Sequence, residues 1–135
     1  MNLGTLGVAG IAVIISAVPV VAHHSFAMFN AGATKTVEGV IKEFQWTNPH
    51  SWIVMMVPNS DGQLEQWAIE MGGPIGLARQ GWTPKTLKPG MQVKTVIHPM
   101  NDGSNGGQFM AITLPDGTLM GNVNAPVGPN AGAGP

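Results

Sequence analysis

Five short stretches of the chain predict β-strands, four from alternating or β-forming residues and one, residues 50–57, from a continuous apolar run. Turn signals such as Asp61-Gly62 and Pro89-Gly90 separate them, and residues 75–80 predict one short helix that Gly81 ends. The predicted strands are residues 34–46, 50–57, 64–71, 91–98 and 108–114. The predicted order is therefore three strands, one short helix and two strands.

The first two predicted strands indicate the architecture. Gly39 interrupts the first strand and indicates a bulge or a sharp bend, which would let one strand pair on both sides. Residues 50–57 are apolar on both faces and predict a central strand. Together with the helix position, this is the element order of an OB-fold, a five-stranded Greek-key barrel. A β-sandwich or a flattened half-barrel fits the same pattern.

The predicted inward-facing residues of the third and fourth strands are Trp67, Ile69, Met71, Met91, Val93, Thr95 and Ile97.

Residues 1–22 predict a secretory signal peptide. Residues 7–21 are almost wholly apolar, and Val20 and Ala22 are small enough for the −3 and −1 positions of a cleavage site. The segment before residue 7 has no Lys or Arg, which is unusual for a signal, so an uncleaved anchor or a buried core helix is the alternative. Cleavage predicts a periplasmic or secreted protein that meets the secretion machinery and signal peptidase and has no membrane attachment afterwards.

The rest of the chain divides around the predicted barrel. The roughly 110 residues after the signal suffice for one small domain with one core. The predicted divisions are an N-terminal arm at 23–33, an OB-like barrel domain at 34–120 and a disordered tail rich in Gly, Pro and Asn at 121–135. Within the barrel domain, the glycine-rich residues 99–107 predict a flexible loop.

Composition narrows the classes of function. Charged residues make up 10% of the chain and the net charge is −1, so nothing in the charge balance attracts nucleic acid or an anionic membrane. The absence of cysteine excludes disulfides, thiolate metal sites and thiol nucleophiles. Ser51 lies in no nucleophile elbow, and no phosphate-binding loop or dinucleotide motif occurs. No enzymatic activity is therefore assigned, although a small copper oxidase or oxygenase is one further hypothesis.

Several long motifs resemble a family of small exported bacterial proteins catalogued as a domain of unknown function. The resemblance covers nearly all of residues 23–119. It implies export and one small β-rich domain, and it implies no established activity. The motifs are HHSFAMF, EFQWTNPHSWI, WAIEMGGPIGLARQGW, LKPGMQV, VIHPMNDGSNGGQF and TLPDG.

The four histidines carry the candidate chemistry. His23 and His24 follow the predicted cut, His50 begins the second strand and His98 ends the fourth. Strand ends gather at the rims of a small barrel, so two of these side chains could meet. Solvated terminal histidines and turn-capping roles for His50 and His98 are the simpler interpretation.

Copper is the metal that this arrangement favours. Cleavage after Ala22 would give His23 a free amine, so that its amine and ring could chelate Cu(II), with His50 or His98 as the second histidine and His24 as an auxiliary ligand. Tetragonal nitrogen ligation suits Cu(II), and zinc is the next candidate because three or four histidines can hold it. Thioethers that could support Cu(I) are those of Met28, Met100 and Met110.

A metal-free role is the alternative hypothesis. Trp46 and Trp52 flank the Asn48-Pro49-His50 turn, and they either pack into the core or form a surface for a small ligand. With the 99–107 loop, this rim could contact a periplasmic partner protein. Arg79, the only arginine, predicts an ion pair with Glu70.

Overall fold

A computed structural model describes residues 26–128. The predicted signal segment, His23, His24 and the last seven residues of the predicted tail lie outside this range. The elements are η1 (Phe26–Met28), β1 (Lys35–Gln45), β2 (Trp52–Pro58), β3 (Leu64–Glu70), α1 (Pro74–Ala78), β4 (Gln92–Pro99), β5 (Gly106–Thr113) and β6 (Leu119–Gly121). No helix within residues 26–128 has the length and apolar character needed to cross a bilayer.

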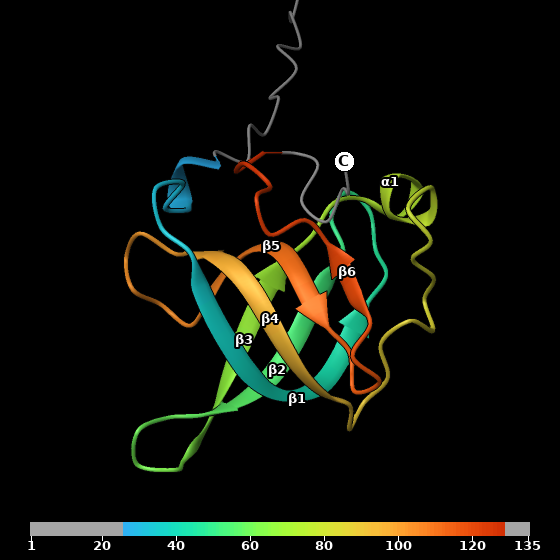
Figure 1. Ribbon diagram of the computed structural model, residues 1–135. Helices are drawn as coiled ribbons and strands as arrows, with labels where there is room; N and C mark the ends of the chain where they lie inside the picture. The colour runs from blue at the N-terminus through green and yellow to red at the C-terminus, as the bar shows by residue number, and fades with distance from the viewer. Residues whose placement is uncertain (1–25, 129–135) are drawn as a thin grey trace, which may run out of the picture.

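The strands close into a barrel. Their order is β3-β2-β1-β4-β5-β6, and an additional parallel pairing between β3 and β5 joins the two sides (Figure 1). The predicted five-stranded OB-like barrel with one short helix after the third strand is confirmed. The β3–β5 pairing rules out the open alternatives, a sandwich or a half-barrel. The pattern did not predict β6, which adds a short strand beside β5.

Strand β1 pairs with two strands, as the bend predicted from its sequence suggested. Its first half pairs with β4 and its second half with β2. The register shift lies between Ile41 and Glu43 rather than at Gly39. Gly39 has a different role, because a Cβ there would collide with the carbonyl oxygen of Met56. The extra residue in the bulge turns Phe44 toward the core after the buried Ile41.

The core follows the predicted inward-facing positions. Six of them are buried, while Met91 is partly buried at the edge of the core cluster. Helix α1 adds Leu77, and Trp82 from the following loop meets Phe109 of β5 edge to face, with ring centroids 5.5 Å apart. The buried six are Trp67, Ile69, Met71, Val93, Thr95 and Ile97.

The glycine-rich segment is partly strand, which corrects the prediction of a flexible loop over 99–107. Gly106 and Gly107 pair with Ala68 and Ile69 of β3 and thereby close the barrel. A Cβ at Gly106 would lie 2.7 Å from the carbonyl oxygen of Ala68, and one at Gly107 would collide with that of His98. The glycines are therefore required by close strand approach, which a sequence pattern does not distinguish from loop flexibility.

The segment after β6 returns to the barrel, so the disorder predicted from residue 121 onward does not apply to residues 121–128. Ala125 is buried, and the backbone of Gly128 forms two hydrogen bonds with the side chain of Gln108. Figure 1 places this red segment, the blue arm and α1 at the same end of the barrel. Polar anchors within β4 and β5 hold the segment, and its own composition does not reveal them.

Candidate functional site

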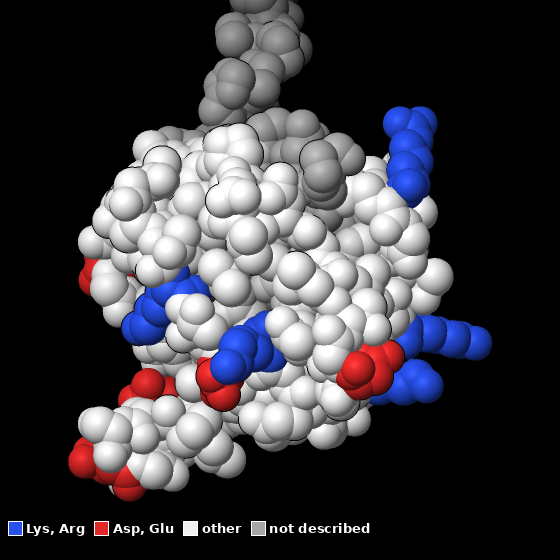
Figure 2. Space-filling view, in the orientation of Figure 1, with Lys and Arg blue, Asp and Glu red and all other residues white. Residues whose placement is uncertain are grey.

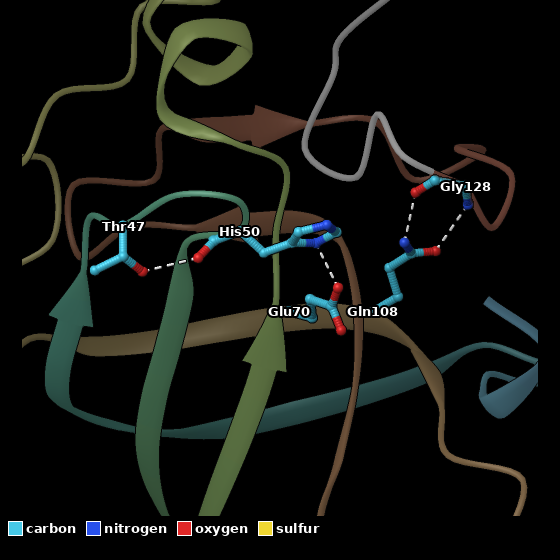
Figure 3. Close-up of polar contacts among 5 residues, drawn as sticks. All are labelled: Thr47, His50, Glu70, Gln108 and Gly128. Atoms are coloured by element: carbon cyan, nitrogen blue, oxygen red, sulfur yellow. Dashed lines mark hydrogen bonds and ion pairs between the residues drawn. The ribbon is translucent and has the colours of Figure 1, made fainter. Parts of the chain in front are cut away.

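The imidazole of His50 contacts the carboxylate of Glu70 at this end of the barrel. His50 follows a cis Asn48-Pro49 bond, and Thr47 donates a hydrogen bond from Oγ1 to the carbonyl oxygen of His50 at 2.8 Å. Nδ1 of His50 lies 2.5 Å from Oε1 of Glu70, the last residue of β3 (Figure 3). The side chains are 19% and 7% exposed respectively. A carboxylate this deeply buried requires a partner, and the imidazole provides it.

The backbone around His50 is closely packed. Hydrogen bonds from Ser51 N to the Gly72 carbonyl and from Met71 N to the Ser51 carbonyl continue the β2–β3 pairing past the end of both strands. A Cβ at Gly73 would lie 2.8 Å from the carbonyl oxygen of Pro49. The absence of a side chain at Gly73 thus allows the turn at Pro49 to lie against the segment after β3, which places His50 beside Glu70.

Two cavities flank Trp52 and Glu70, and both residues line each cavity. The first, of about 150 Å³, is completed by the turn residues Thr47, Asn48, Pro49 and His50. The second, of about 180 Å³, is completed by Met28, Phe29, Ala68, Met100, Ser104, Asn105, Gly106 and Gly107. Of the two tryptophans predicted for this rim, Trp52 lines both cavities and Trp46 lines neither.

The N-terminal arm lies over the same region. The ring of Phe26 is 6.4 Å from the ring of His50, measured between centroids. Asn101 holds the arm through its backbone N–H, which donates to the Met28 carbonyl at 2.8 Å, and through its amide, which donates to the Ala27 carbonyl at 2.7 Å. The arm therefore enters the described structure beside His50, a few residues after His23 and His24.

His98 occupies a different environment. Nδ1 lies 2.9 Å from the carbonyl oxygen of Ala33 and Nε2 lies 2.8 Å from that of Ala125. The residue is 5% exposed, and both ring nitrogens contact the backbone of the terminal segments. In this arrangement the ring joins the arm to the segment after β6, and neither nitrogen is directed at a metal position shared with His50.

A row of cross-strand neighbours connects the two histidine environments. Trp52 is paired with Glu70, Glu70 with Gln108, and Gln108 with His98. Directly paired residues project from the same face of a sheet. The row therefore runs across β2, β3, β5 and β4, from the two cavities to His98, whose ring contacts both terminal segments. Figure 3 draws the two middle members of the row, Glu70 and Gln108.

The structure also decides two further predictions, which concern Trp46 and Arg79. Trp46 is partly buried against the core and meets Phe44 edge to face, with centroids 5.7 Å apart. The predicted ion pair between Arg79 and Glu70 is wrong, because His50 contacts the carboxylate instead. The sequence pattern places Glu70 near the end of the third strand, but its contact with His50 depends on how the turn before β2 lies against that end.

The described charges are mixed in sign. Figure 2 shows acidic and basic side chains interspersed over the lower part of the face in view. Lys94 and Glu38 form an exposed ion pair, with 2.7 Å between Nζ and Oε1. Within residues 26–128, no group of three His, Cys, Asp or Glu side chains could hold a metal ion. The His50–Glu70 pair supplies two such groups.

Residues 11–109 match the family model DUF6152, described as a family of unknown function. The chain belongs to this family. No curated protein matches the sequence. Among solved structures, the mitochondrial single-stranded DNA binding protein Rim1 of S. cerevisiae is similar with a TM-score of 0.47 and 16% identity, over 62% of this chain and 93% of Rim1. The membership of this DUF6152 protein thus assigns it a family and no activity.

Proposed function

We propose that this DUF6152 protein is an exported, periplasmic metal-binding protein that holds copper at the His50 end of its barrel, for binding, delivery or tolerance. The observation that carries the proposal is the contact between Glu70 and Nδ1 of His50 beside a cavity. Metal-binding histidines commonly donate one ring N–H to a carboxylate, which fixes the tautomer and makes the other nitrogen a better ligand. Nδ1 is engaged by Glu70, so Nε2 is the coordinating nitrogen.

The remaining ligands come from the residues before Phe26. His23 is three residues upstream of Phe26, a separation that covalent geometry limits to about 10 Å. Phe26 packs beside His50, so this reach makes His23 and His24 candidates for the same ion. After cleavage at Ala22, the amine and ring of His23 together with Nε2 of His50 provide three nitrogens, a set that suits Cu(II).

His98 is not needed for this ligand set. Both of its ring nitrogens contact backbone carbonyl oxygens, and recruiting it would remove the clasp between the arm and residues 122–128. His24 serves as an auxiliary ligand. Zinc is the competing metal, because histidine nitrogens and a nearby carboxylate also meet its requirements.

Calorimetric titration with Cu(II) tests the proposal. The protein that begins at His23 is compared with a form that retains residues 19–22, and with the His50→Gln variant, whose amide still donates a hydrogen bond to Glu70. We expect the retained extension and the variant each to weaken Cu(II) binding by at least about tenfold, or about 1.4 kcal/mol. Parallel titration with Zn(II) ranks the metals. Equal affinity for all three proteins would exclude a site built from His23 and His50.

The position of Trp52 favours a second candidate function. Because Trp52 borders both cavities, the same rim could bind a flat small ligand or the side chain of a partner protein without metal. Indole N–H shifts in NMR spectra of chelator-treated protein, titrated with small aromatic and sugar probes, test this function. Saturable shifts that the Trp52→Ala variant abolishes would support it, and a Trp52 resonance unchanged by every probe would argue against it.

A further inference from the structure

The second cavity beside Trp52 has a lining of a different chemical kind from the His50 cavity. Its volume is about 180 Å³, and its lining includes Met28 and Met100 together with the indole of Trp52. The carboxylate-bearing residue Glu70 lies at the boundary with the His50 cavity. The donors on this side of Trp52 therefore include soft thioethers, whereas His50 provides a harder ring nitrogen.

Two hydrogen-bonded segments carry the methionines. Phe29 and Met100 form an isolated antiparallel bridge, and the backbone N–H of Asn30 donates to the Pro99 carbonyl at 2.8 Å. Asn101 N–H donates to the carbonyl of Met28 itself. Backbone bonds therefore hold the segments that carry Met28 and Met100 side by side, and both residues line the cavity.

We infer that this cavity is a binding site for a soft monovalent cation, Cu(I), with the thioethers of Met28 and Met100 as ligands and Trp52 as a neighbouring aromatic face. Thioethers are soft ligands that select Cu(I), and an indole face attracts a cation within about 6 Å of its centroid. A largely apolar cavity also disfavours a doubly charged ion more than a singly charged one, because the desolvation cost rises with charge.

The inference rests on the proposed function in taking copper as the metal, but it uses different residues. Cu(II) binding in the proposal requires the His23 amine and His50. Cu(I) binding here requires neither, and it does not depend on cleavage after Ala22. The two sites share only the wall formed by Trp52 and Glu70, so each can be lost while the other is retained.

The test is competition for Cu(I) against a chromophoric chelator under anaerobic conditions, repeated with Ag(I) as a redox-inert probe. The variant is Met28→Leu combined with Met100→Leu, which keeps apolar volume and removes both sulfurs. The matched control is Met91→Leu combined with Met120→Leu, since both residues are partly buried methionines at the edge of the core. Circular dichroism verifies that every variant is folded.

We expect the Met28/Met100 double variant to lose at least about tenfold in Cu(I) affinity and the control to stay within about threefold. Trp52→Phe should remove the fluorescence change that accompanies binding. Unchanged Cu(I) affinity in the double variant would overturn the inference. Cu(II) binding without Cu(I) binding would overturn it while leaving the proposed function intact. Cu(I) binding without Cu(II) binding would support this cavity and contradict the His23–His50 site.

Discussion

His50 and His98 have similar sequence surroundings and opposite structural roles. Each is adjacent to a proline at the end of a strand. His50 is partly exposed, contacts one buried carboxylate and borders a cavity. His98 is buried and contacts two backbone carbonyls from segments at opposite ends of the described chain. The pair shows that position at a strand end does not by itself make a histidine a ligand.

The difference arises from what the two ring nitrogens meet. His50 contacts the side-chain carboxylate of Glu70 through Nδ1, and a carboxylate in this position orients the ring of a metal-binding histidine. Backbone carbonyls from two segments instead make His98 a structural connector. The row from Trp52 through Glu70 and Gln108 to His98 places both arrangements on one face of the barrel.

The largest expected effect is on stability, at His98. The His98→Ala variant removes both contacts and leaves the carbonyls of Ala33 and Ala125 without their partner. We expect the free energy of unfolding to fall by about 2–4 kcal/mol. Urea denaturation measures this change, and His50→Gln, which keeps a donor for Glu70, should stay within about 1 kcal/mol. An equal loss for both variants would remove the distinction between the two histidines.

The next effect concerns metal binding at Glu70. Glu70→Gln keeps the size of the side chain but removes the carboxylate that contacts Nδ1 of His50. Loss of a carboxylate that orients a metal-binding histidine weakens metal binding by roughly 10–100-fold. Calorimetry with Cu(II) measures it, and His98→Ala is the control that should leave the affinity unchanged. If Cu(II) binds more weakly to His98→Ala than to Glu70→Gln, the metal site lies at His98 and the proposed site at His50 is wrong.

A smaller effect is expected at Gln108. Its amide donates to the Gly128 carbonyl at 2.6 Å and its oxygen accepts from the Gly128 N–H at 3.0 Å. Gln108→Leu keeps the apolar volume but removes both bonds, so we expect a loss of about 1–2 kcal/mol. Hydrogen exchange at the Gly128 amide should accelerate, while Cu(II) affinity should not change. Unaltered exchange at Gly128 would contradict a role for Gln108 in holding this segment.

The barrel could be predicted from the sequence because it depends on local patterns. Alternation and β-forming residues located four of the barrel strands, and the apolar run after His50 located β2 and predicted its central position. The parallel pairing at Gly106 and Gly107 could not be predicted, since contact between β3 and β5 is non-local and its glycines resemble a loop. The sequence pattern therefore predicted the strands and their order, but not the β3–β5 pairing that closes the barrel.

The candidate site was predicted only in part, for the same reason. His50 and Trp52 could be selected by residue type and by the turn between the first two strands. Glu70 meets His50 because the turn before β2 lies beside the end of β3, and His98 acquires its role from Ala33 and Ala125, both distant in sequence. Neither relation has a local signal, so the two histidines could not be told apart before the fold was known.

The smallest expected effect is at Asp102, in the loop between β4 and β5 that begins with Met100 of the second cavity. Hydrogen bonds from the hydroxyl and the backbone N–H of Ser104, at 2.6 and 2.9 Å, lower the pKa of this exposed carboxyl. A lowered folded-state pKa stabilises the fold at pH values above the unfolded pKa, and the contribution disappears as the pH falls through the folded pKa.

Asp102→Ala should therefore be less stable than the natural chain at neutral pH, with a difference that shrinks as the pH falls below about 4. Urea denaturation at a series of pH values measures the difference. Asp61→Ala is a suitable control, because that carboxyl lies in the β2–β3 hairpin, away from both cavities. If the effect of Asp102→Ala is independent of pH, the turn is held by its backbone alone. The loop next to Met100 then needs no carboxylate to keep its position beside the cavity.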